Sequence, residues 1–367
     1  MSGQRPALVL FIDSLPHRYV GELPFLSSMQ VGALKPGFGY SMNIKAQLFA
    51  GMTPDDLGQL CSWNPTGQPS SAMRMLSGLR GLDGNAFATR WIHRLGSRLV
   101  GKPLAWAPLH LLRYFDHHEI NAYQREFPHP TILTTPGAVS LLYRDFPPGP
   151  ERDRLLFAEA TRRVNEAEGL YFVASADLDH VGHRFGPGSA EHRAKMHELD
   201  ELAAELVQAF LAAHPGAPVA IMSDHGMASV NGSVDPSVEQ HLGPMHPDRY
   251  LAAVDATMAR FWVRDSSLRE RVAEFAGSVK AARLIEGDER KKYGIADPIH
   301  GDFIVLLEEG LVFCPSFYFR EPPAGMHGYH PDAPDQRAFF ATLNVNDPSP
   351  TQVDRVYPFL RRLLEKL

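Results

Sequence analysis

Apolar positions along the chain form short unbroken runs and longer amphipathic stretches. The runs at Ala7–Ile12, Gly169–Ala174 and Pro218–Met222 have the length and continuity of strands buried on both faces of a sheet. The stretches at 153–168 and 189–213 have the spacing of helices that cover such a sheet. This alternation predicts an α/β fold with a central, mostly parallel sheet flanked by helices.

Other segments depart from this alternation. Residues 55–130 are irregular and rich in Pro, Gly, Trp and His, whereas residues 250–318 predict a smaller α+β unit. Further expected elements are helices near 70–79, 86–99, 266–279 and 353–364, and strands at 259–263 and 303–307. We therefore expect an α/β core at 1–54, 131–249 and 319–367, an inserted lobe at 55–130 that lies over the site carried by this core, and a small α+β cap at 250–318.

Metal-capable side chains follow the three apolar runs. Asp13 ends the first run, Asp179 and His183 lie just beyond the second, and Asp224 and His225 directly follow the third. The carboxyl ends of parallel strands share one edge of a sheet, where α/β proteins place their chemistry. Side chains four residues apart can converge on one cation within a helical turn. We therefore expect these five side chains to meet.

Glycines lie next to several of the candidate metal ligands in the sequence. Gly226 permits the turn that would bring Asp224 and His225 to one site. His327 lies in the glycine-flanked segment 325–330, where His330 competes with it as a ligand.

Ser41 follows a glycine-rich turn and precedes a predicted helix that Gly51 ends. Serine is a preferred N-cap residue, and the same position presents free N–H groups and a positive dipole end to a phosphate. A metal beside Ser41 would lower the pKa of its hydroxyl and produce a nucleophile. Lys45, one turn further on, either faces the same anion or is a solvated helix lysine.

Each candidate also has an ordinary structural interpretation. Asp13 and Ser41 suit helix caps, Asp179 and His183 suit a polar loop, and His327 suits a surface position. Together, however, these carboxylates, imidazoles and one hydroxyl indicate a pair of zinc-like cations beside a nucleophile. This combination predicts phosphoryl or sulfuryl transfer.

Composition narrows the class of protein. A length of 367 residues predicts one large domain with an insertion, or two domains. The net charge of −6 disfavours a nucleic-acid polymer as partner, and two cysteines, Cys61 and Cys314, are too few for a disulfide framework. Met1–Pro6 lacks the apolar segment of a signal peptide, and no apolar run reaches the ~20 residues of a membrane span. We expect a cytoplasmic protein; a peripheral membrane role stays open.

Five segments together resemble the alkaline phosphatase superfamily, and most closely its nucleotide pyrophosphatase/phosphodiesterase branch, the type I phosphodiesterases. Residues 55–150 and 230–320 contribute nothing to this resemblance. The segments are Asp13, Ser41 with the following Leu48–Pro54, Asp179–Pro187, Ser223–Met227 and Met326–Tyr329.

The resemblance implies an alkaline-phosphatase-like core with two divalent metal ions, zinc being favoured and manganese also suited to the ligands. It assigns one ion to Asp179, His183 and His327. It assigns the other to Asp13, Asp224 and His225, with the Ser41 oxygen beside it. The implied reaction is in-line attack of the nucleophile on phosphorus, followed by hydrolysis of a phospho-enzyme intermediate.

The chain departs from this pattern around the nucleophile. The phosphodiesterase branch usually has threonine where Ser41 stands, and an asparagine further on that contacts phosphate. Asn43 is the asparagine that follows here, and in a helix it is rotated about 200° from Ser41. Lys45 is therefore the second candidate for substrate binding beside Asn43. A sulfatase would have Pro and Arg at these two positions.

We therefore predict a hydrolase of phosphodiester or pyrophosphate bonds in a small phosphorylated organic substrate. Because no phosphate-clamping arginine can be identified, a phosphomonoesterase or phosphoryl transferase of the same superfamily is the alternative. A non-catalytic metal-dependent protein that binds a phosphorylated ligand is a third hypothesis. Trp63, Trp91 and Trp106 are candidates for an aromatic wall around a substrate. The leaving group, the metal in vivo and the oligomeric state stay open.

Overall fold

The computed structural model describes residues 6–83, 86–101, 103–123 and 127–365, so most of the Met1–Pro6 segment lies outside it. The chain forms two compact units. The first unit comprises Met1–Met52, Asn121–Ser229 and Pro323–Leu367, and the second comprises Thr53–Ile120 and Val230–Pro322. Among the described residues, no helix is both long enough and apolar enough to cross a membrane.

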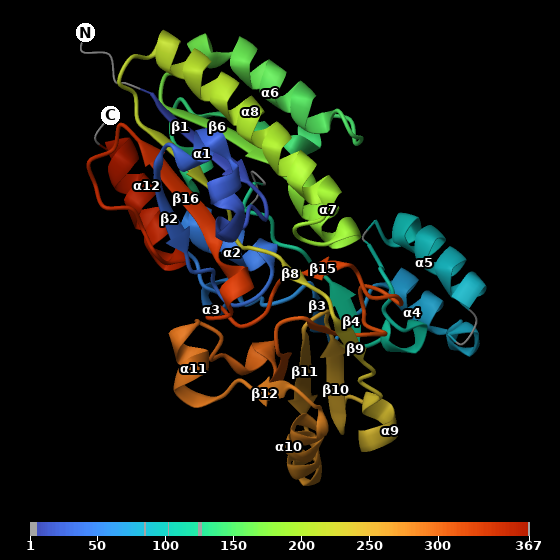
Figure 1. Cartoon of the computed structure of the whole chain (residues 1–367). Coiled ribbons are helices and arrows are strands. Elements are labelled where there is room, and N and C mark those ends of the chain that lie inside the picture. Colours follow the sequence, from blue (N-terminus) through green and yellow to red (C-terminus); the bar gives the residue numbers. More distant parts are fainter. Residues whose placement is uncertain (1–5, 84–85, 102, 124–126, 366–367) are drawn as a thin grey trace. The chain divides into compact units, whose positions relative to one another are not determined.

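The first unit is built on a six-stranded sheet with the order β2-β16-β7-β1-β6-β5 (Figure 1). Strand β1 runs parallel to both of its neighbours, and β5 runs parallel to β6, whereas β16 runs antiparallel to β7 and β2. The mostly parallel sheet is thereby confirmed. The strands are β1 Ala7–Ile12, β2 Gln30–Leu34, β5 Val139–Leu142, β6 Leu170–Ser175, β7 Val219–Met222 and β16 Ala338–Leu343, and a separate pair is β8 Ala228–Ser229 with β15 Gly325–Met326.

Both faces of this sheet are covered by helices, which explains the unbroken apolar runs. Every residue of β1 is buried. Leu8 and Leu10 share a core with side chains of α6 and α8, whereas Phe11 packs edge-on against Phe49 of α2 at a centroid distance of 5.4 Å. The helices of this unit are α1 Pro24–Ser27, α2 Ser41–Ala50, α6 Arg152–Arg162, α7 Asp177–Phe185, α8 Ala190–Ala213 and α12 Val356–Glu365.

The helix boundaries follow local signals. Helix α2 ends at Gly51, which has a positive φ of 70°, as its glycine predicted. Helix α8 begins after Ser189, whose side chain accepts a hydrogen bond from the His192 N–H as an N-cap. Helix α6 is shorter than the predicted 153–168, since a 3₁₀ turn at Val164–Glu166 follows it.

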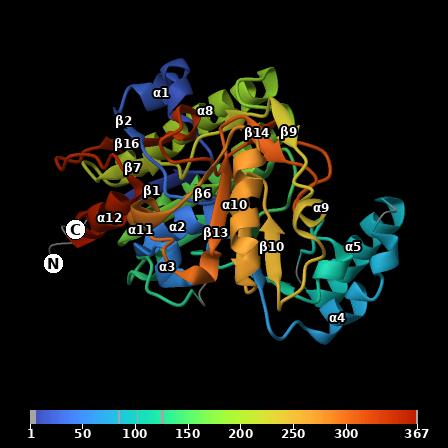
Figure 2. The same ribbon diagram turned by 90° about the horizontal axis from the view of Figure 1, so that it is seen from below.

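The second unit contains a four-stranded antiparallel sheet with the order β10-β11-β13-β12. Helix α10 packs on this sheet, with Phe275 against Phe261 (Figure 2). The strands of the unit are β3 Trp63–Pro65, β4 Phe115–His117, β9 Gly232–Val234, β10 Tyr250–Val254, β11 Met258–Val263, β12 Ala282–Leu284, β13 Phe303–Leu307 and β14 Leu311–Phe313. Its helices are α3 Pro54–Leu57, α4 Ser71–Ser77, α5 Ala86–Val100, α9 Val238–Leu242, α10 Arg269–Ser278 and α11 Gly287–Lys292.

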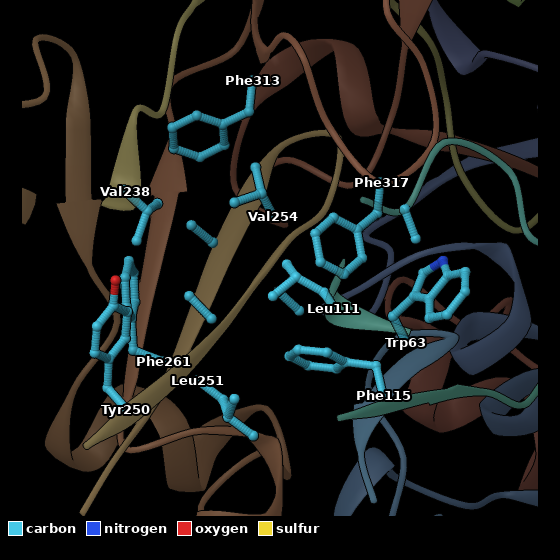
Figure 3. Close-up of a cluster of buried hydrophobic side chains, with 14 of the residues drawn as sticks. Trp63, Leu111, Phe115, Val238, Tyr250, Leu251, Val254, Phe261, Phe313 and Phe317 are labelled. Carbon is cyan, nitrogen blue, oxygen red and sulfur yellow. The ribbon is translucent and has the colours of Figure 1, made fainter. Parts of the chain in front are cut away.

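One hydrophobic core serves the whole second unit. Trp63 and Phe115 come from the segment predicted as an inserted lobe, and Tyr250 and Phe261 come from the segment predicted as a cap (Figure 3). The structure therefore groups 55–130 and 250–318 together, unlike the division based on sequence. The physical reason is that apolar side chains of both segments are buried in the same core, where they pack against each other.

Candidate functional site

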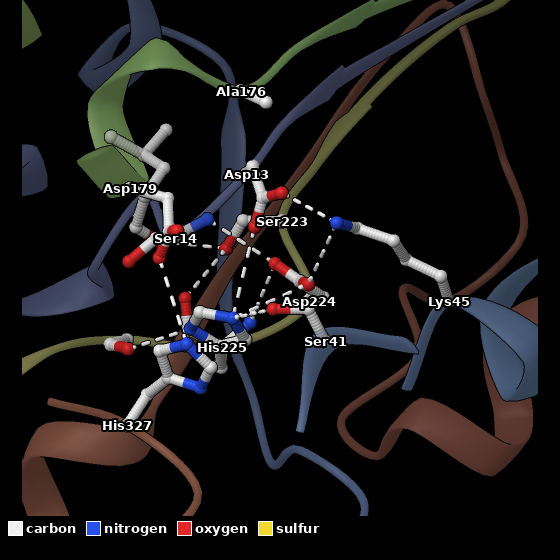
Figure 4. Close-up of polar contacts among 12 residues, drawn as sticks. Asp13, Ser14, Ser41, Lys45, Ala176, Asp179, Ser223, Asp224, His225 and His327 are labelled. Carbon is white, nitrogen blue, oxygen red and sulfur yellow. Dashed lines mark hydrogen bonds and ion pairs between the residues drawn. The ribbon is translucent and has the colours of Figure 1, made fainter. Parts of the chain in front are cut away.

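The three parallel strands β1, β6 and β7 end at one edge of the sheet, and the candidate side chains meet there (Figure 4). Asp13 directly follows β1, α7 begins two residues after β6, and Asp224 lies two residues after β7. Register accounts for the meeting, because Ile12 lies beside Ser175 and Phe11 beside Met222. The first unit thus brings together all seven residues predicted as metal ligands.

Asp179 and His183 lie on helix α7, one turn apart. The His183 Nε2 atom is 3.4 Å from Asp179 Oδ1, and the His183 Nδ1 atom is 2.8 Å from the carbonyl oxygen of Gly325. A carbonyl only accepts hydrogen bonds, so His183 Nδ1 carries a proton. The Nε2 atom therefore turns toward the carboxylate, as in a histidine oriented for metal binding.

The turn after β7 is held by hydrogen bonds to the segment after β1. Ser14 adopts a left-handed backbone, with φ of 63°, and its N–H donates to Asp224 Oδ1 at 3.2 Å. The Ser223 hydroxyl donates to the carbonyl of Leu15 at 2.8 Å. His225 Nδ1 lies 2.8 Å from the carbonyl of Gly226, which leaves Nε2 of His225 directed at the site.

Gly226 is needed for close packing rather than for an unusual φ. A Cβ atom there would lie 2.2 Å from the carbonyl oxygen of Asp335 and 2.9 Å from that of Arg337. We expect Gly226→Ala to lower the free energy of unfolding by about 1–3 kcal/mol, because backbone atoms must shift to admit the methyl group. Urea unfolding of the variant measures this, and Gly21→Ala, where the added Cβ meets no atom within 4 Å, is the control. Equal stability of the two variants would contradict the expectation.

Ser41 is the first residue of α2, and Tyr40 occupies the N-cap position. Ser41 is therefore one residue beyond the cap that its sequence context suggested. Its Oγ atom lies 2.6 Å from Nε2 of His225. Because His225 Nδ1 carries the proton, Nε2 accepts, and the Ser41 hydroxyl donates to it.

Lys45 contacts two of the candidate ligands. Its Nζ atom lies 2.5 Å from Asp13 Oδ2 and 3.8 Å from Asp224 Oδ2. Burial favours the neutral amine, but these carboxylates outweigh it and raise the pKa of Lys45 well above its usual value. The solvated-lysine interpretation is therefore wrong: Lys45 is a buried cation at the site. Asn43, the other residue predicted to bind substrate, is fully buried within α2.

His327 follows β15 and is buried beside the other imidazoles. Its Nε2 atom lies 3.7 Å from Asp179 Oδ1, and its ring stacks on that of His225 with centroids 3.7 Å apart and planes at 14°. His330 instead lies 3.8 Å from the carboxylate of Asp332. The geometry thus places His327, not His330, among the candidate ligands.

Two groups of side chains each place their ligand atoms within 4.8 Å of one another. Asp13, Asp224 and His225 form one group, with the membership that the resemblance implies. The other group comprises Asp179, His327 and, in place of the implied His183, again His225. His183 remains next to this second group through its contact with Asp179.

The buried carboxylates fit cation binding. Within the described part of the chain, the buried oxygens Asp13 Oδ1, Asp179 Oδ1 and Asp224 Oδ2 receive no hydrogen bond. A buried carboxylate oxygen without a donor is costly, and a divalent cation would satisfy it. The mixed nitrogen and oxygen donors suit zinc or manganese.

The charges at the site shift several pKa values. Burial, together with the nearby Asp224 carboxylate, raises the pKa of Asp13 well above its usual range. Burial also acts to raise the pKa of Asp179, but attraction to His183 and His327 prevails and holds it well below its usual range. Asp179 raises the pKa of His183 to about 8 against the opposing effect of burial. Binding a metal through Nε2 of His183 requires that this nitrogen carry no proton.

The sequence did not predict two aromatic side chains that lie near Lys45 at the site. The Lys45 Nζ atom lies 5.5 Å from the ring centroid of Phe11 and 6.0 Å from that of Tyr123. Phe11 belongs to the β1 run and Tyr123 to an irregular segment, so neither carried a local signal for the site. Their rings stabilise the lysine cation in addition to the carboxylates.

Comparisons with known proteins agree with this geometry. The family described as "Type I phosphodiesterase / nucleotide pyrophosphatase" matches residues 114–330. No curated protein sequence matches the chain.

Solved structures with the same fold include ectonucleotide pyrophosphatase/phosphodiesterase 5 from mouse. It is 14% identical, has a TM-score of 0.67, and the match covers 98% of this chain and 95% of that one. An inactive threonine-to-alanine variant of the mouse protein, in complex with AMP, matches with a TM-score of 0.68, 14% identity and the same coverage. The human protein matches with 16% identity, a TM-score of 0.65, and coverage of 99% and 95%.

The family match spans more than half of the chain, and the alkaline-phosphatase-like fold accompanies it over nearly the full length. The chain therefore belongs to the type I phosphodiesterase/nucleotide pyrophosphatase family, in the corresponding branch of the alkaline phosphatase superfamily, and is a phosphoric ester hydrolase.

Proposed function

We propose that the chain hydrolyses phosphodiester or pyrophosphate bonds in a small nucleotide-like substrate, with Ser41 as the nucleophile. The observation that supports this most directly is the position of Ser41 Oγ, 2.6 Å from His225 Nε2 and at the first residue of a helix. His225 belongs to both groups of candidate metal ligands, so the hydroxyl lies beside both. This is the placement that an activated nucleophile requires.

Asp13, Asp224 and His225 would hold one divalent cation, and Asp179, His327 and His183 the other, with zinc as the favoured ion. When bound, the cations lower the pKa of the Ser41 hydroxyl and balance negative charge on the phosphoryl oxygens. The Asp13 and Asp224 carboxylates also orient Lys45, whose ammonium group supplies a further positive charge next to the nucleophile. The contacts of Lys45 thus support its role as a substrate-binding residue.

In the proposed reaction, Ser41 Oγ attacks phosphorus in line and displaces the alcohol or phosphate leaving group. The Oγ–P bond forms as the P–O bond to the leaving group breaks, and water later cleaves the resulting phosphoserine. Ser41 stands at the N-terminus of α2, and the positive dipole end of this helix would favour the negatively charged phosphoryl oxygens there.

AMP in the complex of the similar mouse protein favours a nucleotide as the substrate class. We also place the activity in the cytoplasm, since Cys61 and Cys314 are both free thiols.

The test is the ratio of initial rates on bis(p-nitrophenyl) phosphate and p-nitrophenyl phosphate, measured with zinc-loaded protein. We expect a ratio well above one, because Lys45 already pairs with two carboxylates and offers a single positive charge to the doubly charged monoester. Loss of both activities in Ser41→Ala ties the rates to this site. A ratio well below one would instead assign the protein to the phosphomonoesterases.

A further inference from the structure

Helix α5 exposes a continuous apolar stripe. Phe87, Trp91, Leu95 and Leu99 recur every four residues, and their exposed fractions are 74, 47, 56 and 59%. A spacing of four residues places these side chains along one side of the helix. Most large apolar side chains of the chain are buried, so four exposed in one row form a patch that water solvates poorly.

Three arginines border this stripe. Arg90, Arg94 and Arg98 are exposed and also recur every four residues. The guanidinium group of Arg94 lies 5.8 Å from the ring centroid of Trp91. Across residues 71–100 there are five arginines and one acid, Asp83, whereas the whole chain carries a net charge of −6. The Asp83 carboxylate pairs with Nδ1 of His110 at 3.0 Å. The arginines therefore leave this surface with an excess of positive charge.

The opposite side of α5 is firmly packed. His93 is buried, with its two ring nitrogens each 2.7 Å from a carbonyl oxygen, those of Thr89 and Ala107. A Cβ atom on Gly96 would lie 2.8 Å from Leu104 and 2.9 Å from Leu76 of α4. Figures 1 and 2 show α4 lying alongside α5. The helix is thus a fixed element of its unit whose outer face is left without a partner among the described residues.

We propose that this outer face of α5 attaches the protein to the surface of an anionic membrane. A helix with Trp, Phe and Leu on one side and arginines beside them lies in the plane of the lipid interface, with its apolar side chains among the acyl chains. The arginine stems extend along the apolar surface while their guanidinium groups reach lipid phosphates. Here Phe87, Trp91, Leu95 and Leu99 would insert, and Arg90, Arg94 and Arg98 would bind headgroups.

Charge argues against a second copy of the chain as the occupant. An isologous contact across this stripe would bring three arginines against the same three arginines of the other copy. Such like-charge contacts disfavour association. An anionic lipid surface complements both the apolar row and the arginines.

The experiment is flotation of the zinc-loaded full-length protein with two kinds of vesicle. One kind is phosphatidylcholine alone, and the other is an equal mixture of phosphatidylcholine and phosphatidylglycerol. We expect binding to the mixed vesicles that weakens at high salt. The triple variant Arg90→Gln/Arg94→Gln/Arg98→Gln should lower the partition coefficient on the order of a hundredfold, from about fivefold per arginine. Trp91→Ser and Leu95→Ser should each lower it at least about tenfold.

Matched controls come from the first unit. Leu155→Ser removes another side chain that is 47% exposed, and Arg162→Gln/Arg355→Gln/Arg361→Gln removes the same total charge from exposed arginines elsewhere. These controls should bind as the wild type does. Trp91→Phe should also bind, and should lose the blue shift of tryptophan emission that the wild type shows with vesicles.

The proposal is overturned if the wild type binds neither kind of vesicle, or if the control variants lose binding as strongly as the α5 variants. It is also overturned if sedimentation shows a dimer that Trp91→Ser dissociates while vesicles have no effect, since the occupant is then a second copy.

Discussion

Replacing Ser41 with alanine is expected to reduce kcat on bis(p-nitrophenyl) phosphate by at least about 10⁴-fold while the protein keeps its metal. The substitution removes the one oxygen that lies 2.6 Å from His225 Nε2, and with it the atom proposed to bond to phosphorus. The carboxylates and imidazoles stay in place because they are held by the strand ends and by α7. The measurements are steady-state kinetics and the zinc content of the dialysed protein.

Two further variants separate a nucleophile from a structural hydroxyl. Ser41→Thr keeps a hydroxyl at the same position and should keep turnover, as threonine is the usual residue in this branch of the superfamily. Ser28→Ala removes an exposed hydroxyl that donates to the Phe25 carbonyl, and should leave turnover unchanged. Turnover near the wild-type rate in Ser41→Ala would remove Ser41 as the nucleophile.

Replacing Asp179 with alanine is expected to lower the metal content from about two ions per chain to about one and the rate by more than about a hundredfold. Asp179 Oδ1 is buried without a hydrogen bond and lies near both His183 and His327, so its loss leaves these imidazoles without their shared carboxylate. The stability gained on adding zinc should shrink as well, by up to about 3–4 kcal/mol at saturating metal. Elemental analysis and thermal unfolding with and without zinc measure the two effects.

The same helix supplies the control. Asp177 is the first residue of α7 and precedes Asp179 by two residues. Its carboxylate pairs with Arg152 at 3.2 Å, and it belongs to neither candidate metal group. Asp177→Ala should therefore retain both ions. If Asp179→Ala binds as much zinc as the wild type, the assignment of Asp179 as a ligand is refuted.

The sequence by itself determined the three parallel strands β1, β6 and β7 and the sheet edge that carries the chemistry. The apolar runs at β1, β6 and β7 are local patterns, and each ends in a polar ligand type within the next few residues. Covalent adjacency then guarantees that Asp13, Asp179 and Asp224 reach the same edge once the strands are parallel. The spacing of Asp179 and His183 likewise gave their convergence, because a helix brings residues four apart together.

Only the tertiary structure decided how these groups pair. Three contacts join segments that are far apart in the chain. Lys45 pairs with Asp13 and Asp224, His225 stacks on His327, and Ser41 contacts His225. The same holds for β16, which enters the sheet antiparallel beside β7, and for the single core shared by the two segments of the second unit. Neither the periodicity of apolar residues nor nearness in the sequence predicts such contacts. They form when apolar faces from distant segments are buried together, because the polar groups enclosed with them must then find partners.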